Sequence, residues 1–539
     1  MTAYRPPAKR RGDAIGAVAA DPESAPSMTA LLRRWPLALL AVLAAAGFAR
    51  LYGLDREGLW NDEVLSIVMS RGTLVEVLAA VLRDVHPPLH FFLCWLWQPI
   101  AGESAWLWRL PSALCGLAAV GLVWRISARL VSRRAAPVAS IVAATSTMAI
   151  YYAQEARSYA LLLLLTLVAL DRALTWEASR RNRDAVLLSL AASLLLYTHY
   201  FGALVLLVFV AWMLLRLARA PDALGAPAKS PDWRGLAQFG LTQAVALLTF
   251  VPWLWAVRQQ IGQAEDDFWL PRPEPHWLPF TLAIFGGLAR PVWGGSRLTL
   301  GELGLGLAVT LPLVAVLGSG LLRQVAWGPK NEAGSSRESK PTRAAIWSLL
   351  FAWLLAPAVI AYAVSQGPVP IYSHRNLIVS LPAWWLLAAA LIDRIPRPTG
   401  RALALAVVLA PAVSGGLWYY GTPHKEQWRE LAAEVATSLQ PSDHVSVEDA
   451  WLVEVFRFHL GDRPYRPLLE LNPSTLLGVR KLWLIRGPSS RPDHLARVNR
   501  ELAALQMAGF RVTSMKRFIG AELIVLEPPL RPTREAVER

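Results

Sequence analysis

Long apolar runs recur along this chain and constrain its fold more than any other feature. About eleven runs of 17 to 23 residues occur, and an α-helix of that length crosses about 30 Å of hydrocarbon. A hydrophobic content of 54% and a mean hydropathy of +0.36 exclude an ordinary soluble protein. The sequence predicts an all-α polytopic membrane domain with spans at 35–53, 107–125, 135–153, 158–175, 184–200, 202–218, 236–257, 298–320, 344–365, 375–392 and 401–420.

Basic residues set the expected orientation of these spans. The net charge is +15, but Arg and Lys cluster in short segments between apolar runs rather than along one helix face, which argues against nucleic acid as a partner. Residues 1–34 form a basic tail that the positive-inside rule assigns to the cytoplasm. Each basic connection then falls on the same side, and the carboxylates and histidines gather on the outer side, where they are candidates for function.

The end of the chain has a different pattern. After a membrane domain at 35–420, residues 421–539 alternate between helical periodicity, as in "EQWRELAAEVATSLQ", and strand periodicity, in "DHVSVED", "KLWLIRG", "RVTSMKRF" and "AELIVLEP". This alternation predicts a small α/β domain on the outer, periplasmic side. We therefore expect three parts: tail, membrane domain and periplasmic domain.

An acid pair, Asp62 and Glu63, follows the first span in "GLWNDEVLSIVMSRG". Asn61 is a good N-cap, and acidic side chains in a first turn are favoured by the helix dipole, so the pair has a purely structural explanation. The apolar residues after it recur at helical spacing but are interrupted by charges too often for a span. We expect an amphipathic helix lying in the membrane interface.

Two further stretches carry ionisable groups on the outer side. His86 precedes Pro87 and Pro88, where a second helix should begin, so it could meet a phosphate oxygen or simply anchor the turn. Glu155 and Arg157 fall in a short turn between two spans. Spacing alone leaves two readings open: an intramolecular pair, or a guanidinium that binds a substrate phosphate.

Three more polar residues lie at the outer ends of expected spans. Arg109 stands in "WRLPSAL", and His374 and Arg375 stand in "IYSHRNLIVSLP". Interfacial anchoring or snorkelling of the long side chain accounts for such residues at least as well as substrate binding does.

An ordered set of motifs gives the sequence a family likeness. The succession "NDEVLS", "HPPLHFFLCWLW", "WRLPSALCGL", "YYAQEARSYALLLLL", "SHRNLIVSLPAWWLLAAAL" and "EQWRELAAEV" resembles bacterial membrane glycosyltransferases of the GT-C superfamily. Within it, the likeness is to the group of protein O-mannosyltransferases, lipid A aminoarabinose transferases and rhizobial core galacturonosyltransferase-like proteins. The likeness runs in order over nearly the whole chain.

The resemblance implies an inverting enzyme that moves a sugar from a polyprenyl-phosphate donor to a lipid, glycan or protein acceptor. It implies a multi-pass location in the cell inner membrane, with the active site on the periplasmic side. Asp62 matches the position of the family's general base, with Glu63 as its orienting or ligand-binding partner. Arg157 and Arg375 match positions near the carrier phosphate, and His86 stands where the aminoarabinose branch has lysine, which disfavours that sugar.

Other readings compete with the transferase. The predicted substrate-binding set is His86, Arg109, Glu155, Arg157, His374 and Arg375. The same groups could serve a secondary transporter or flippase, although no internal repeat or mid-membrane polar site is evident. A non-catalytic receptor is a third reading, with Asp62 only a helix-start acid. The resemblance also allows a divalent cation, but the sequence has no DxD-like ligand cluster.

Overall fold

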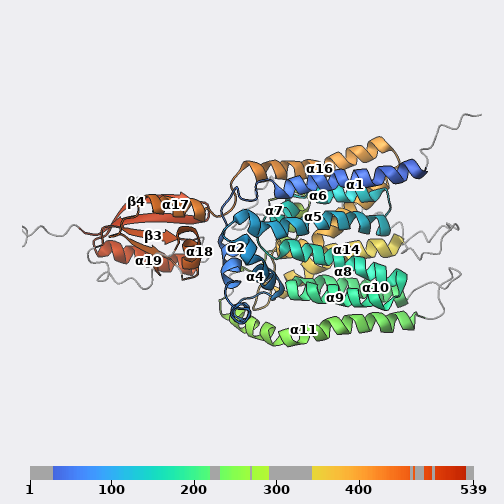
Figure 1. Cartoon of the computed structure of the whole chain (residues 1–539), viewed down its shortest axis with the longest axis horizontal. Helices are drawn as coiled ribbons and strands as arrows, with labels where there is room; N and C mark the ends of the chain where they lie inside the picture. The colour runs from blue at the N-terminus through green and yellow to red at the C-terminus, as the bar shows by residue number, and fades with distance from the viewer. Residues whose placement is uncertain are drawn as a thin grey trace, which may run out of the picture.

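The protein is described by a computed structural model covering residues 28–218, 231–267, 270–290, 343–448, 450–461, 465–467, 479–487 and 492–529. A bundle of long helices occupies one part of the molecule, and a sheet with its helices lies beyond one end of that bundle (Figure 1). The helices are α1 (Met28–Leu51), α2 (Asn61–Met69), α3 (Leu74–Leu82), α4 (Leu89–Ala101), α5 (Ala105–Leu130), α6 (Ala135–Thr145), α7 (Thr147–Ala153), α8 (Tyr159–Ser179), α9 (Asn182–Thr198), α10 (Phe201–Ala218), α11 (Trp233–Asp267), α12 (Trp277–Phe285), α14 (Arg343–Val364), the 3-10 helix η1 (Asn376–Ser380), α15 (Leu381–Asp393), α16 (Pro398–Gly421), α17 (Trp428–Ser438), α18 (Ala450–Leu460) and α19 (Pro492–Met507).

Ten of the eleven predicted spans coincide with helices of the structure. Among the described residues, seven helices are long and apolar enough to cross a membrane, or eight when α6 and α7 are joined. Helix α16 turns large apolar side chains such as Leu403 and Leu417 outward, as a lipid-facing helix does. The chain is a multi-pass membrane protein, while the eleventh predicted span, 298–320, lies outside the described residues.

One predicted span is broken. The run 135–153 was expected to be a single helix, but α6 and α7 meet at an angle of 58°. The last carbonyl groups of α6 have no helical partner beyond the break. Buried Arg50 of α1 supplies donors instead, since its guanidinium binds the carbonyl oxygens of Ala143 at 3.1 Å and Ala144 at 3.2 Å.

The interfacial segment after α1 is also more divided than predicted. Two short helices, α2 and α3, replace the single amphipathic helix, and Gly72 between them has a φ of +91°. Such a φ favours glycine. The side chain of Thr73 caps α3 by accepting from Glu76 N–H, and α4 begins at Leu89, directly after the two prolines as expected.

The sheet has five strands in the order β2-β1-β3-β5-β4. Strands β2 and β3 flank β1 in parallel, and β5 runs antiparallel to both β3 and β4, with Trp483 opposite Val445 on one side and Val525 on the other. Four strands match predicted segments, whereas β2 was not predicted. The strands are β1 (His444–Val447), β2 (Tyr465–Pro467), β3 (Leu482–Arg486), β4 (Arg511–Phe518) and β5 (Ala521–Glu527).

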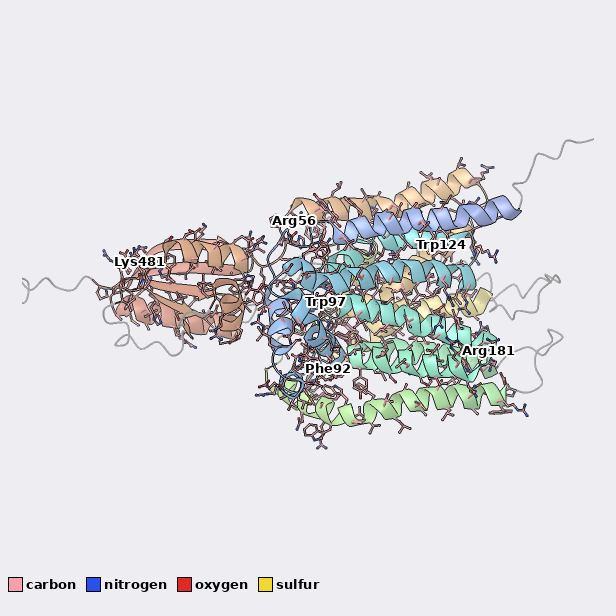
Figure 2. All side chains as sticks on the ribbon, viewed as in Figure 1. Arg56, Phe92, Trp97, Trp124, Arg181 and Lys481 are labelled. Carbon is pink, nitrogen blue, oxygen red and sulfur yellow. The ribbon has the colours of Figure 1, made fainter. Side chains whose placement is uncertain are left out.

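The apolar core is continuous between the sheet and the first loop of the bundle. Val64 and Ile67 of α2 share a buried cluster with Trp428 of α17 and Phe456 of α18. Helix α2 therefore packs between the bundle and the sheet. Figure 2 shows Arg56 at this end of the bundle, and Arg181, from one of the basic connections, at the opposite end.

Candidate active site

Asp62 lies in the first turn of α2 at the sheet end of the bundle. Its Oδ2 accepts a hydrogen bond from Arg375 Nη1 at 2.9 Å, and 21% of the side chain is exposed. The other oxygen, Oδ1, has no hydrogen-bond partner among the described residues. Asp62 is therefore a carboxylate fixed through one oxygen, with the second oxygen available to another molecule.

Glu63, the next residue, is fully buried, and both oxygens of its carboxylate accept hydrogen bonds. Its carboxylate receives two hydrogen bonds from Arg109, at 2.8 and 2.6 Å, and one each from the N–H groups of Ala156 and Trp60. Burial alone would raise the pKa of Glu63, but the Arg109 charge and these hydrogen bonds lower that pKa to about 2. Glu63 thus joins α2 to α5 and to the turn after α7.

Arg109 uses all its donors within the protein. Besides the two bonds to Glu63, its Nη1 and Nη2 groups bind the carbonyl oxygens of Leu54, Glu57 and Gly58 at 2.5, 2.9 and 2.8 Å. A guanidinium has five N–H groups, and all five are accounted for. The structure therefore gives Arg109 the part of a buried positioning residue, with no donor left for a substrate.

Arg157 lies beside Asp62 without a carboxylate bonded to it. Its Nη1 donates to the backbone oxygen of Asp62 at 3.2 Å and to Ser66 Oγ at 2.6 Å, and its Nε is buried without a partner. Only 7% of the residue is exposed. A buried cation bonded only to neutral oxygens is a favourable place for an anion to bind.

The predicted pair between Glu155 and Arg157 does not form. Glu155 instead binds Lys425 Nζ at 3.2 Å, and its Oε2 is buried without a partner. Burial is the main reason that the pKa of Glu155 is raised. Neighbouring residues in a tight turn point in different directions, which separates the two side chains.

The predicted histidines occupy the surroundings of this cluster. His86 Nδ1 lies 2.8 Å from Asp84 Oδ2, and its ring lies 5.8 Å from that of His199. His374 lies next to Arg375 in the chain, and its Nε2 is buried without a hydrogen bond. Burial and the Arg375 charge lower the pKa of His374 to about 4, so the ring is neutral at pH 7.

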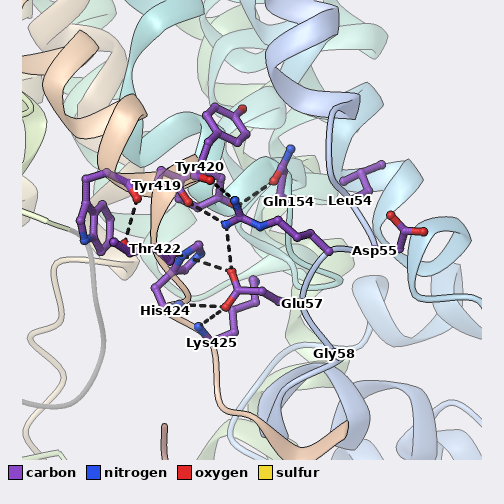
Figure 3. Close-up of polar contacts among 12 residues, drawn as sticks. Leu54, Asp55, Glu57, Gly58, Gln154, Tyr419, Tyr420, Thr422, His424 and Lys425 are labelled. Carbon is purple, nitrogen blue, oxygen red and sulfur yellow. Dashed lines mark hydrogen bonds and ion pairs between the residues drawn. The ribbon is translucent and has the colours of Figure 1, made fainter. Parts of the chain in front are cut away.

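A segment far along the chain from Asp62 completes the site and was not predicted. We call residues 422–427, between α16 and α17, the tether. Glu57 Oε2 accepts the backbone N–H groups of His424 and Lys425, both at 2.8 Å (Figure 3). Glu426 Oε2 accepts from the Asn61 N–H at 3.2 Å. The charged run "HKEQ" after the last apolar run was the only sequence signal for these contacts.

The described residues contain no group of three or more His, Cys, Asp or Glu side chains arranged to hold a metal ion. The cluster thus consists of one partly open carboxylate, Asp62, with two buried arginines, Arg157 and Arg375, and the ring of Tyr159 lying 5.8 Å from Arg375 Cζ. A carboxylate beside buried guanidinium groups can accept a proton while an anion is held next to it.

Comparisons with known proteins agree on the type of fold. Residues 85–226 match the family model described as dolichyl-phosphate-mannose-protein mannosyltransferase. The solved structure of ArnT from Cupriavidus metallidurans bound to undecaprenyl phosphate is 15% identical, with a TM-score of 0.50, over 93% of this chain and 98% of that chain. An oligosaccharyltransferase from Archaeoglobus fulgidus, in complex with Zn and sulfate, is 12% identical, with a TM-score of 0.47, over 84% of this chain and 68% of that chain.

The search of curated protein sequences gave no match. The family model covers the segment that contains His86, Arg109 and Arg157, and the ArnT likeness extends over nearly all of both chains. The chain therefore shares the fold of this ArnT structure, and residues 85–226 match the mannosyltransferase family model.

Proposed function

We propose that the protein transfers a sugar from a polyprenyl-phosphate donor to an acceptor hydroxyl, with Asp62 as general base and Arg157 as the main contact of the donor phosphate. One observation carries the proposal: Asp62 has one oxygen fixed by Arg375 and one available, directly beside a guanidinium with no carboxylate bonded to it. A related protein, ArnT, is known in complex with undecaprenyl phosphate, which supports a lipid-phosphate donor.

The chemistry follows from these positions. Asp62 Oδ1 accepts the proton of the acceptor hydroxyl as its oxygen attacks the anomeric carbon. The bond between that carbon and the phosphate oxygen breaks, and the bonding electrons leave with the polyprenyl phosphate. Arg157 stabilises the negative charge that develops on this leaving group. A single displacement of this kind inverts the anomeric configuration.

The predicted roles divide among the remaining residues. Arg375 orients Asp62 through Oδ2, and the Glu63–Arg109 pair holds α2 against α5. His86, Glu155 and His374 lie around the cluster, and within the described part of the chain none of them is hydrogen-bonded to Asp62 or Arg157. We propose that they shape the donor site rather than take part in proton transfer. The proposed orientation puts the cluster on the periplasmic side of the inner membrane.

The test is a transfer assay in membranes supplied with radiolabelled polyprenyl-phosphate sugars and acceptor lipids extracted from the envelope. We expect Asp62→Asn to lower the transfer rate by about 10² to 10⁴, with unchanged insertion and thermal unfolding. Asp55→Asn is the matched control, because Asp55 is an exposed carboxylate of the same loop. It should leave the rate as it is.

Two outcomes would contradict the proposal. Full activity of Asp62→Asn would remove Asp62 from the chemistry. If the wild-type protein transferred no sugar but moved a solute across the membrane, and Asp62→Asn stopped that movement, the same cluster would belong to a transporter. The anomeric configuration of the product, measured by NMR, tests inversion separately.

A further inference from the structure

A polar pocket lies where the loop after α1 meets the tether and α17. It has a volume of about 240 Å³, which is below the roughly 300 to 1,000 Å³ of sites for drug-sized ligands and fits a group of monosaccharide size. Its polar side chains come from two distant parts of the sequence: Arg56, Glu57, Thr422, Lys425, Glu426, Gln427 and Glu430.

Some of these groups are already engaged within the protein. Arg56 Nη2 donates to the carbonyl oxygen of Tyr419 at 2.9 Å, and Lys425 Nζ is paired with Glu155 at 3.2 Å. Glu57 is occupied by the backbone of the tether. Each cation of the lining also lies beside a carboxylate, Arg56 at 3.5 Å from Glu57 and Lys425 at 3.2 Å from Glu155.

Other polar atoms of the lining have no hydrogen-bond partner among the residues that the structure describes. Glu426 uses only Oε2, toward Asn61 and Trp428, so Oε1 is unbonded. Gln427 uses only its Oε1, which leaves its NH₂ group, and Glu430 uses only Oε1, which leaves Oε2. Two carboxylate oxygens and an amide donor suit hydroxyl groups. Glu430 is paired with Arg429 at 2.9 Å, so the free groups of the lining offer hydrogen bonds to hydroxyls rather than a positive charge for an anion.

The pocket adjoins the proposed catalytic centre through two shared residues. Glu426 contacts the N–H of Asn61, the residue before Asp62, and Lys425 contacts Glu155, which precedes Arg157 by two positions. A ligand in the pocket therefore touches the same tether residues that border the catalytic cluster. The donor phosphate has its own place at Arg157, which leaves this pocket for the acceptor.

We infer that the pocket binds a sugar unit of the acceptor, so that the acceptor is a glycan or glycolipid rather than a protein side chain. This inference rests on the proposed transferase function for its biological meaning. The geometry that carries it is the juxtaposition of a monosaccharide-sized polar pocket, three unbonded polar groups and a wall shared with the neighbourhood of Asp62.

Two glycines of α16 provide a matched pair for the test. A Cβ added at Gly421 or at Gly416 meets no atom within 4 Å, so there is open space at both positions for a side chain to begin. Only Gly421 lines the pocket. Gly421→Leu should fill the pocket, whereas Gly416→Leu adds the same side chain to the same helix outside it.

Binding is measured by saturation-transfer-difference NMR on the full-length protein, with methyl glycosides of hexoses, hexosamines and hexuronic acids as probes. We expect a signal from at least one class with the wild type and with Gly416→Leu, and at least a fivefold weaker signal with Gly421→Leu. Glu430→Gln, which keeps the backbone and size of the site, should weaken the signal by a smaller factor.

The same variants are then assayed for transfer. We expect Gly421→Leu to raise the KM for a glycolipid acceptor about tenfold and to leave the KM for the donor unchanged. Absence of a signal from every glycoside, or equal signals from the two leucine variants, would overturn the inference while leaving the transferase proposal intact. If a Gly421-dependent signal occurs without any transfer activity, the pocket binds sugar and the transferase proposal fails.

Discussion

The neighbouring carboxylates Asp62 and Glu63 have opposite environments. Asp62 has one hydrogen-bonded arginine and a free oxygen, whereas Glu63 has four hydrogen bonds and no exposure. Successive residues of a helix point about 100° apart, so the same turn directs one acid toward the edge of the site and the other into the core. An acid pair in a sequence can therefore combine one chemical and one structural role.

The largest effect on stability should come from replacing Glu63, the carboxylate with the structural role. Glu63→Gln leaves Arg109 buried without a counter-charge, which costs about 3 to 5 kcal/mol. We expect a large drop in the unfolding midpoint of the detergent-purified protein. Asp62→Asn, which alters a partly exposed group, should change that midpoint little while it abolishes transfer.

A double variant sharpens this comparison. Glu63→Gln combined with Arg109→Met removes both charges, so much of the lost stability should return. Equal midpoints for the wild type and Glu63→Gln would mean that the buried pair does not hold α2 in place. The division of roles between the two carboxylates would then be wrong.

The next largest effect should come from removing the charge of Arg157, the buried cation beside Asp62. Arg157→Gln should weaken binding of polyprenyl phosphate about 10- to 100-fold, because a hydrogen bond to a charged group contributes about 1.5 to 3 kcal/mol. Isothermal titration calorimetry with the purified protein measures this. Arg83→Gln is the control, since Arg83 is an exposed arginine between α3 and α4. Unchanged affinity in Arg157→Gln would assign Arg157 to holding Ser66 and α2 only.

Local patterns predicted much of this molecule. The length of apolar runs located ten helices, and period-two alternation located four strands. The ordered motifs brought Asp62, Arg157 and Arg375 into one hypothesis, and the structure places them in contact. Each of these predictions depends on residues close together in the sequence or on a likeness carried by short motifs.

The missed features depend on contacts between distant residues. Spacing in the sequence offered Arg157, two positions away, as an ion-pair partner of Glu155. The partner in the structure is Lys425, which lies 270 positions away. The hydrogen bond from the His424 N–H to the Glu57 carboxylate joins residues 367 positions apart. The break between α6 and α7 depends on donors from Arg50 in α1. No periodicity or spacing rule reports such pairs, because only the packed helices bring them together.

The smallest predicted effect concerns Glu426, which accepts a hydrogen bond from the N–H of Asn61, the residue before Asp62. Burial, together with the nearby charge of Asp62, raises the pKa of Glu426 to about 7. The ordinary carboxyl value of 4.5 applies to the unfolded chain, so between about pH 4.5 and 7 the folded protein binds more protons than the unfolded one. Its stability must therefore fall as pH rises through that window.

Glu426→Gln removes this titration while it keeps an oxygen that can accept from the Asn61 N–H. We expect the unfolding midpoint of the wild type to fall between pH 5 and pH 8 by the equivalent of roughly 1 kcal/mol after solvent screening, and that of Glu426→Gln to stay flatter. Glu434→Gln alters an exposed carboxylate paired with Lys516 and should follow the wild type. Parallel curves for the wild type and Glu426→Gln would mean that neither burial nor the charge of Asp62 raises the pKa of Glu426, because Glu426 would then titrate alike in the folded and unfolded chain.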